Sequence, residues 1–325
     1  MTSNVLITGG AGFIGSHLTE SLLIKGCTVT VLDNLSTGSL LNLADARDRI
    51  RFVEGDITRL SDIETAITGC DTLVHLAATV LVPETIDDPV GSALVNEIGA
   101  LNMLEAARKS GCRRIVLASS AAVYGNSQNQ SKNENMVFDP QSPYAVQKLA
   151  MEHYASVYHS IYGLETVCLR FFNVYGPRQD PSSQYSGVIS IFLEKACRRL
   201  APVIFGDGLQ TRDFIYVGDV VDACRSAMTA SGVAGQVFNI GTGRPIAINS
   251  LWDAISIIAE VPLRPEIASE RSGDIRHSVA DIKRATHLLG FSPTVSLEDG
   301  LRMTLEWYKG QMKNRWWHKV AAMEL

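Results

Sequence analysis

The chain has 325 residues, of which 46% are hydrophobic and 19% are charged, and its formal net charge is −5. This composition excludes general disorder, and 34 acidic against 29 basic residues argue against a nucleic-acid binder that works by bulk charge. No apolar run is long enough to span a bilayer and no signal peptide is visible, so we expect a cytoplasmic protein without a membrane partner. Six scattered cysteines without a C-x-x-C pair, and seven histidines without metal-ligand spacing, indicate reduced thiols and no metal site.

Short apolar runs alternate with helical stretches in the first half of the chain. The predicted strands are 5–8, 28–33, 51–54, 72–75, 114–119 and 165–170, and the predicted helices are 17–25, 61–68, 93–110 and 143–162. This order is typical of parallel strands joined by right-handed crossovers, with helices on both faces. The expected fold class is therefore α/β, with a Rossmann-type doubly wound parallel sheet and a smaller, mixed α/β C-terminal lobe.

The alternation of strands and helices ends after Asn173, where a stretch containing Pro, Ser and Gly precedes helices mixed with short extended segments. We therefore place a boundary near residue 175. Residues 1–175 are expected to bind a dinucleotide and residues 176–325 to form the substrate lobe, with 214–248 as a segment that can return to the first domain.

A glycine-rich turn follows the first predicted strand and opens a helix. Gly9, Gly12 and Gly15 give the spacing G-x-x-G-x-x-G. Such a turn lets a pyrophosphate reach backbone N–H groups at a helix N-terminus, where the helix dipole adds partial positive charge. The alternative is a tight turn without a ligand, but the position between a strand and a helix favours the dinucleotide.

Carboxylates end the second and third predicted strands. Asp33 can accept both ribose hydroxyls of an adenosine and would repel a 2′-phosphate, which favours NAD over NADP. Its alternative role is a turn or cap, which the following Asn34 supports. Asp56 suits the adenine amino group or, equally well, the N-cap of the next helix.

Tyr144 and Lys148 are four residues apart in a predicted helix, so they share one face of it. Ser142 suits the N-cap and Pro143 the first helical position. The ammonium and a positive nicotinamide ring are expected to lower the pKa of the phenol, so that Tyr144 can take a proton from a sugar hydroxyl and return it. The alternative is an amphipathic helix with one aromatic residue and one surface lysine.

Ser120 lies where the fifth predicted strand ends, within the stretch 119–125. The carboxyl ends of parallel strands face the ligand crevice, so Ser120 can hydrogen-bond the same reacting oxygen as Tyr144. The alternative is a polar turn after a strand. Four features thus occur in the expected order: the glycine-rich turn, the acidic end of the second strand, the serine and the Tyr–Lys pair. Their occurrence together argues against a chance match.

With these motifs the sequence resembles the extended short-chain dehydrogenase/reductase family, and within it the nucleotide-sugar 4-epimerases, from Val5 to about Tyr308. The stretches that carry the resemblance are 8–15, 33–34, 75–78, 119–125, 144–148, 170–178, 211–215 and 271–281. The resemblance implies that Ser120, Tyr144 and Lys148 are catalytic. It implies NAD as the cofactor, held by Gly9, Gly12, Phe13, Ile14, Gly15, Asp33, Asn34, Asp56, Ile57, Ala77, Ala78, Tyr144 and Lys148. It implies a UDP-sugar substrate, held by Ser120, Tyr144, Asn173, Arg212, Arg271, Asp274 and Ser278.

Arginines suit a diphosphate because the guanidinium group offers a fixed fork of donors. The alternative for Arg212 and Arg271 is an ion pair with the neighbouring Asp213 and Asp274. Two alanines are also informative: Ala121 and Ala122 stand where related dehydratases and decarboxylases carry acidic residues. A methyl group cannot shuttle a proton, so return of the hydride, and hence 4-epimerisation, is favoured over elimination.

Ser278 stands where relatives restricted to glucose and galactose have a bulky aromatic residue, and a small side chain leaves volume for an acetamido group. We therefore expect UDP-GlcNAc and UDP-GalNAc as substrates, with UDP-glucose and UDP-galactose as further ones; the alternative is that Ser278 only packs locally. Leu81 stands where many relatives have a serine, and Ala122 stands where some epimerases have a threonine, so the choice of substrate stays open. The departure at Leu81 keeps an acidic or modified sugar open, and the alternative function is a UDP-glucuronate 4-epimerase or decarboxylase. A third reading is a non-catalytic sensor of NAD or a nucleotide sugar.

The resemblance also implies a homodimer formed through the helices 93–110 and 143–162. In the second helix, Val146, Leu149, Ala150 and Val157 are expected to pack on the sheet.

Overall fold

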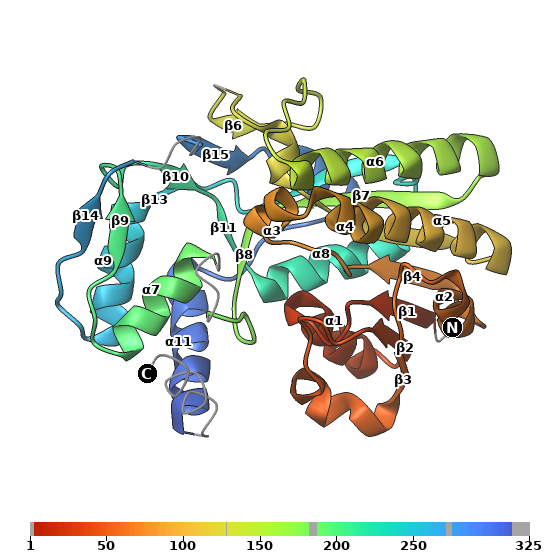
Figure 1. The fold of residues 1–325 in the computed structure, drawn as a ribbon, viewed down its shortest axis with the longest axis horizontal. Coiled ribbons are helices and arrows are strands. Elements are labelled where there is room, and N and C mark those ends of the chain that lie inside the picture. The colour runs from red at the N-terminus through yellow and green to blue at the C-terminus, as the bar shows by residue number, and fades with distance from the viewer. Residues whose placement is uncertain (1–2, 128, 182–186, 271–274, 314–325) are drawn as a thin grey trace.

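The computed structural model describes residues 3–127, 129–181, 187–270 and 275–313. Seven parallel strands form its central sheet, in the order β12-β7-β5-β4-β1-β2-β3 (Figure 1). They are β1 (Asn4–Thr8), β2 (Thr28–Asp33), β3 (Ile50–Glu54), β4 (Thr72–His75), β5 (Arg114–Ser120), β7 (Glu165–Phe171) and β12 (Gln236–Ile240). The α/β class is confirmed, and the six predicted strands are found with ends that differ by at most one residue. The seventh strand, β12, lies within the segment 214–248.

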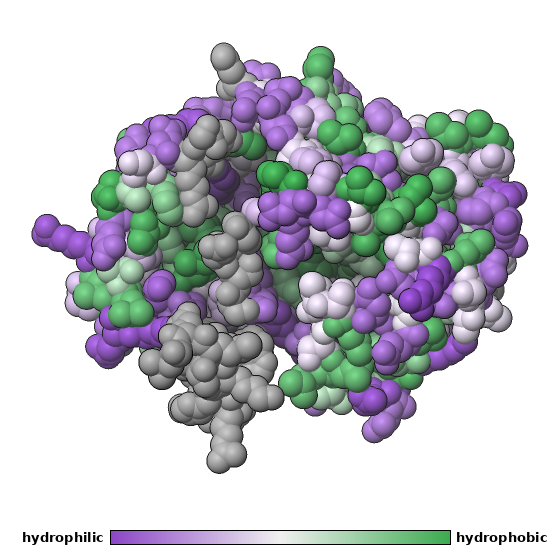
Figure 2. Space-filling model, viewed as in Figure 1, coloured by the Kyte–Doolittle hydropathy of each residue, from purple (hydrophilic) through white to green (hydrophobic). Residues whose placement is uncertain are grey.

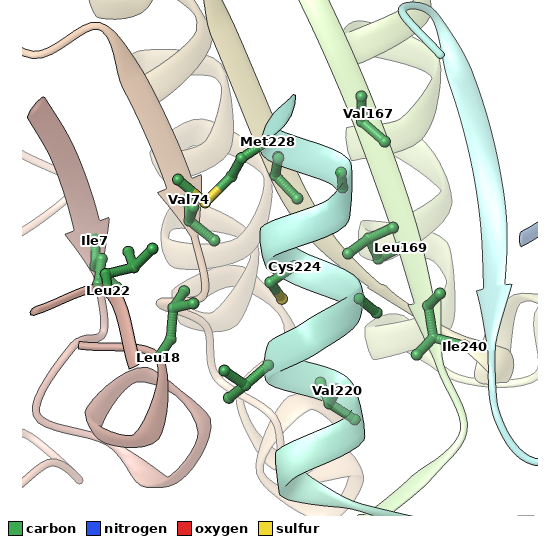
Figure 3. Packing of buried hydrophobic residues seen from close by; sticks show 14 of the residues in the cluster. Ile7, Leu18, Leu22, Val74, Val167, Leu169, Val220, Cys224, Met228 and Ile240 are labelled. Atoms are coloured by element: carbon green, nitrogen blue, oxygen red, sulfur yellow. The ribbon is translucent and has the colours of Figure 1, made fainter. Parts of the chain in front are cut away.

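Helices cover both faces of this sheet, which is why its strands read as continuous apolar runs rather than alternating ones. On one face, α1 (Phe13–Ile24) and α8 (Val217–Thr229) pack on the sheet. Leu18 and Leu22 of α1 and Cys224 of α8 belong to this buried cluster together with strand residues (Figure 3). On the other face lie α2 (Leu60–Ile67), α5 (Gly99–Ser110) and α6 (Pro143–Tyr162).

The helix predicted over 93–110 is present, but it starts earlier and contains a π-helical turn. In chain order the structure forms α3 (Val82–Asp87), α4 (Pro89–Ala93), the π-helical turn η2 (Leu94–Ile98) and then α5. Asp88 separates the first two, and its carboxylate caps α4 by accepting a hydrogen bond from Gly91 N at 2.8 Å. A π turn is uncommon and often marks a functional site, since it widens the helix locally.

The predicted packing of α6 is wrong for two of its residues. Val146 and Val157 are 48% and 45% exposed, so they face away from the sheet. Met151 and Ala155 occupy the sheet side instead, each 1% exposed. The apolar residues of α6 therefore serve two faces, one covered by the sheet and one exposed.

The C-terminal half surrounds a separate core. Three helices, α7 (Val188–Cys197), α9 (Ile248–Ala259) and α11 (Leu297–Lys313), bury Phe192 and Trp252 between them. The mixed strands of this half are β9 (Val203–Phe205), β10 (Thr211–Arg212), β11 (Phe214–Tyr216), β13 (Ile246–Ala247), β14 (Glu266–Ala268) and β15 (His277–Ala280). Two short strands from earlier in the chain, β6 (Ser131–Lys132) and β8 (Asn173–Tyr175), pair with β15 and β11. The expected smaller mixed lobe is thus present, and segments of the first 175 residues contribute to it.

The two halves leave a hollow between them on the face shown in Figure 2. Within the described residues, no helix is long and apolar enough to cross a membrane, and no group of His, Cys, Asp or Glu is arranged to hold a metal ion. All six cysteines are unpaired.

Candidate functional site

The glycine turn after β1 is shaped by close backbone contacts. Gly9 has a φ of 68°, in the left-handed region that glycine adopts without strain. A Cβ atom on Gly15 would lie 2.1 Å from the carbonyl oxygen of Gly9, so only glycine fits there. Gly12 caps α1 with an extended backbone and no side-chain hydrogen bond. The first N–H groups of α1, at Phe13 and Ile14, are thus left to a ligand, as a pyrophosphate requires.

Asp33 closes β2 beside this turn and is 7% exposed. Its Oδ2 accepts a hydrogen bond of 2.9 Å from Ala11 N, and its Oδ1 accepts one of 2.8 Å from Leu35 N. Burial raises the pKa of this carboxyl group, while the two backbone hydrogen bonds lower it. Asp33 therefore has the turn role, yet each oxygen retains a lone pair for a ribose hydroxyl. The glycine turn and this carboxylate together fit the adenosine diphosphate part of NAD.

Asp56 is not an N-cap, because α2 begins after Arg59. Its Oδ1 accepts from the N–H and hydroxyl of Thr58, and its Oδ2 accepts a hydrogen bond of 3.0 Å from Nδ2 of Asn34. Hydrogen bonds to Thr58 and Asn34 outweigh burial and lower the pKa of Asp56. The predicted cofactor residues Asn34 and Asp56 are thus brought into contact. Ile57, also predicted, is buried against Gly99 of α5.

Ala77 and Ala78 follow β4 at the same edge of the sheet. The N–H of Ala77 donates to Oγ1 of Thr8 at 3.3 Å, and that hydroxyl group contacts Nδ1 of His75 at 2.8 Å. Burial, together with the charge of Lys148, lowers the pKa of His75 to about 3. A neutral imidazole therefore fixes the start of the 77–78 loop next to the glycine turn.

Tyr144 and Ser120 are brought together as predicted. The side chain of Ser120 lies close enough to Tyr144 to lower the pKa of its phenol. Oγ of Ser120 also accepts a hydrogen bond of 3.1 Å from Ala122 N. Ser142 caps α6, because its Oγ accepts a hydrogen bond of 3.2 Å from Ala145 N. This cap fixes the start of the helix two residues before Tyr144. We expected a lowered pKa for Tyr144. Without the nicotinamide charge the structure shows the opposite, because burial raises the pKa of Tyr144 and only the contact with Ser120 lowers it.

Lys148 lies beneath the tyrosine ring, with Nζ 5.8 Å from the ring centroid. Nζ donates a hydrogen bond of 2.8 Å to the carbonyl oxygen of Ala118. Burial lowers the pKa of Lys148 to about 8, while nearby Cys168 and Glu152 act in the opposite direction. The lysine is thus a buried group and not the surface residue of the alternative interpretation.

A buried ion pair behind these residues was missed by the sequence analysis. Glu152, one turn after Lys148, binds Arg170 with an N–O distance of 2.6 Å, and both side chains are under 5% exposed. Oγ of Ser119 donates to Glu152 at 2.5 Å. The only available signal was the spacing Tyr144–Lys148–Glu152 along one helix face.

Three of the predicted substrate residues, Asn173, Arg212 and Ser278, meet at the backbone of Asp213. Nδ2 of Asn173 donates to the carbonyl oxygen of Asp213 at 3.1 Å, and Asp213 N donates to that of Ser278 at 3.0 Å. Arg212 precedes Asp213 and pairs with Ser278 across the parallel strands β10 and β15. Arg271 and Asp274 lie outside the described residues.

The Asp213 carboxylate does not serve as the simple partner of Arg212 that we considered. It is fully buried, and its two oxygens accept hydrogen bonds from Thr242, Gly243 and Ala280. Asp213 therefore holds the 242–243 loop and β15 in place. Nη1 of Arg212 donates to the carbonyl oxygen of Thr211 at 3.0 Å.

Comparisons with known proteins agree with this geometry. Residues 5–241 match the model of the NAD dependent epimerase/dehydratase family. A UDP-glucose 4-epimerase of Mycolicibacterium smegmatis is 40% identical over 315 residues, which cover 94% of this chain and 98% of that protein. The chain belongs to this family, whose members depend on NAD.

Two solved structures are similar over nearly the whole chain. The UDP-N-acetylglucosamine 4-epimerase of Methanobrevibacter ruminantium, in complex with UDP-N-acetylmuramic acid, has a TM-score of 0.92 at 37% identity and covers 96% of this chain and 100% of that one. The UDP-glucose 4-epimerase of Thermus thermophilus, in complex with NAD, has a TM-score of 0.86 at 37% identity and covers 94% and 99%.

Proposed function

We propose that this enzyme is an NAD-dependent UDP-sugar 4-epimerase, an isomerase, that acts on UDP-GlcNAc and UDP-GalNAc and also accepts UDP-glucose and UDP-galactose. The observation that carries the proposal is the contact of Ser120 with Tyr144, above a buried Lys148, at the sheet edge that also holds the glycine turn. Similarity over nearly full length to 4-epimerases supports the reaction type. The choice of sugar rests on this chain's own residues.

In the proposed mechanism, Tyr144 accepts the proton of the sugar C4 hydroxyl and later returns it. Ser120 donates a hydrogen bond to the same oxygen and holds it near the phenol. NAD, which the glycine turn and Asp33 would hold, would supply the acceptor and donor of the C4 hydride and a positive ring whose charge would favour the phenolate. This charge matters because burial by the protein alone raises the pKa of Tyr144.

Residues of the second lobe are proposed to bind the diphosphate of the substrate. Asn173, Arg212 and Ser278 are held on one hydrogen-bonded backbone path through Asp213, so they present a fixed surface to a nucleotide sugar. Ser278 is half-buried and small, which leaves space for an acetamido group at C2. The sugar itself needs freedom to turn over between the two hydride transfers.

The deciding experiment is to incubate the purified protein with single UDP-hexoses and to follow product stereochemistry by NMR. UDP-GlcNAc should give UDP-GalNAc without an added reductant, and UDP-glucose should give UDP-galactose more slowly. Turnover of UDP-glucuronate alone, or release of carbon dioxide, would replace the proposal with the uronate enzyme. Binding without turnover across the panel would leave only the sensor.

We further propose that the enzyme is a homodimer. Val90, Leu94 and Ile98 form an exposed stripe along α4 and η2, and they are 72%, 52% and 46% exposed. Val157 and Ile161 extend exposed apolar surface along α6, which packs beside η2. Hydrophobic side chains gather over these helices in Figure 2. An apolar surface of this kind favours contact with a second copy over contact with water.

A further inference from the structure

A buried side chain joins the helix of Tyr144 to the segment that follows the cofactor loop. Gln147 lies between Tyr144 and Lys148 and is 2% exposed. Its Oε1 accepts a hydrogen bond of 2.7 Å from Nδ2 of Asn96, and its Nε2 donates one of 2.9 Å to Oγ of Ser92. Both polar atoms of Gln147 therefore bind residues outside its own helix, in the π turn and in α4.

Asn96 extends this connection to the loop after β4. Its Oδ1 accepts from Thr79 N at 2.8 Å, and its Nδ2 donates to the carbonyl oxygen of Thr79 at 2.9 Å. The side-chain amide thus binds both polar groups of one residue, much as a neighbouring strand would. Because Thr79 directly follows Ala77 and Ala78, the position of that loop depends on Asn96. Each amide hydrogen of Asn96 has an acceptor, so the network is complete.

The segment 79–96 has four attachments to this network: Thr79 at its start, Pro89 and Ser92 in α4, and Asn96 at its end. Several of its large apolar side chains face solvent, with Val80 56% and Ile86 58% exposed. Apolar packing thus contributes little at those positions. The polar attachments to Gln147 therefore carry much of the segment's placement.

We propose that Gln147 is a positioning residue that, through Asn96 and Ser92, holds the segment 79–96 against the bound cofactor and sugar during turnover. The inference rests on the proposed function. It makes a chemical prediction, because the sugar loses its C4 hydrogen as NAD is reduced. If the segment loosens, the 4-keto sugar leaves before the hydride returns, and NADH and 4-keto sugar are left behind in equal amounts.

The test compares two substitutions of similar length with a distant control. Gln147→Met removes the hydrogen bonds to Asn96, Ser92 and Pro89. Gln147→Glu keeps the acceptor for Asn96. Ile63→Val, in the core of α2, lowers stability without touching the network. We expect Gln147→Met to lower kcat about tenfold with a smaller change in KM, and to weaken NADH binding about tenfold. It should also accumulate NADH absorbance with UDP-GlcNAc, and Gln147→Glu should lie closer to the wild type.

The outcomes separate this proposal from the proposed function. If Gln147→Met matches Ile63→Val in kcat, NADH retention and NADH affinity, the side chain only packs and the proposal is overturned. If the wild type turns over no UDP-sugar, the proposed function fails. The role of Gln147 is then tested by NADH affinity alone, measured by fluorescence titration for Gln147→Met and Ile63→Val. If Gln147→Met does not fold, Ser92→Ala removes one attachment, and an unchanged NADH affinity and NADH retention in that variant would refute the proposal.

Discussion

The ammonium of Lys148 donates a hydrogen bond of 2.8 Å to the carbonyl oxygen of Ala118, two residues before Ser120. This contact fixes α6 against the end of β5, so that Tyr144 and Ser120 meet. It also places a positive charge under the tyrosine ring, 5.8 Å from its centroid. Lys148 thus has a structural part in building the site besides any effect on proton transfer.

Tyr144→Phe should abolish most of the activity and leave the fold intact. The half-buried ring keeps its position, and only the hydroxyl that contacts Ser120 is lost. We expect kcat to fall by roughly 10³-fold, as for loss of a general acid–base group. The measurement is the initial rate with UDP-GlcNAc, beside NADH affinity as the control for an intact cofactor site. Full activity in this variant would disprove the assignment of the phenol.

Ser278→Tyr should change the choice of sugar. The added ring would occupy the space beside C2, and overlap in a packed pocket typically costs about 1–3 kcal/mol. We expect kcat/KM for UDP-GlcNAc to fall roughly 10- to 100-fold, with that for UDP-glucose little changed. Ser278→Ala is the matched control, since it keeps the volume and removes the hydroxyl. If the alanine variant loses UDP-GlcNAc as well, the hydroxyl and not the volume determines the preference.

Replacing Lys148 by Met should alter how stability depends on pH. The folded-state pKa of about 8 lies below the ordinary value of 10.5, so the buried charge costs stability fully below pH 8. That cost disappears as pH rises from about 8 towards 10.5, because the unfolded chain then holds more protons. The stability of the variant relative to wild type should thus fall by about 2 kcal/mol between about pH 7 and pH 9.5.

The measurement is denaturant unfolding of both proteins at the two pH values. Titrating groups far from residue 148 are shared and cancel in the difference, and His75, whose pKa the charge of Lys148 lowers, is neutral at both pH values. A difference that does not vary with pH would mean that the lysine is solvated and titrates normally.

Ile161→Glu should convert the proposed dimer into a monomer. A carboxylate in an apolar contact loses its hydration without a partner. Ile24→Glu is a matched control, because Ile24 is 79% exposed at the end of α1, and Ile161 is 67% exposed on α6. Light scattering at micromolar concentration should give a dimer for the wild type and Ile24→Glu, and a monomer for Ile161→Glu. A monomeric wild type would refute the proposed interface.

The parts of the fold that depend on local sequence were predictable. Strands buried on both faces read as short β-branched runs, and α6 was bounded by Ser142 and Gly163, which act as its caps. The glycine turn and the Tyr144–Lys148 spacing gave the two halves of the site. Each of these signals lies within a few residues of the chain.

The remaining features depend on contacts between distant segments. The π turn is stabilised by the pairing of Asn96 with Thr79 and Gln147, which periodicity does not report. The two exposed valines of α6 could not be separated from its buried residues, because an apolar residue fits either a core or an interface. The raised pKa of Tyr144 reflects a degree of burial that the sequence does not contain.

The placement of β12 at the edge of the main sheet has a consequence for how the chain can be divided. β12 pairs with β7, and α8 covers the strands from the same side as α1, although both elements follow the proposed boundary at residue 175. A fragment that stops there would lack β12 and α8. β7 would then be an unpaired apolar edge strand and one face of the sheet would lose part of its helical cover, which favours aggregation. Limited proteolysis between the lobes should therefore yield nicked but associated pieces rather than two separable bodies.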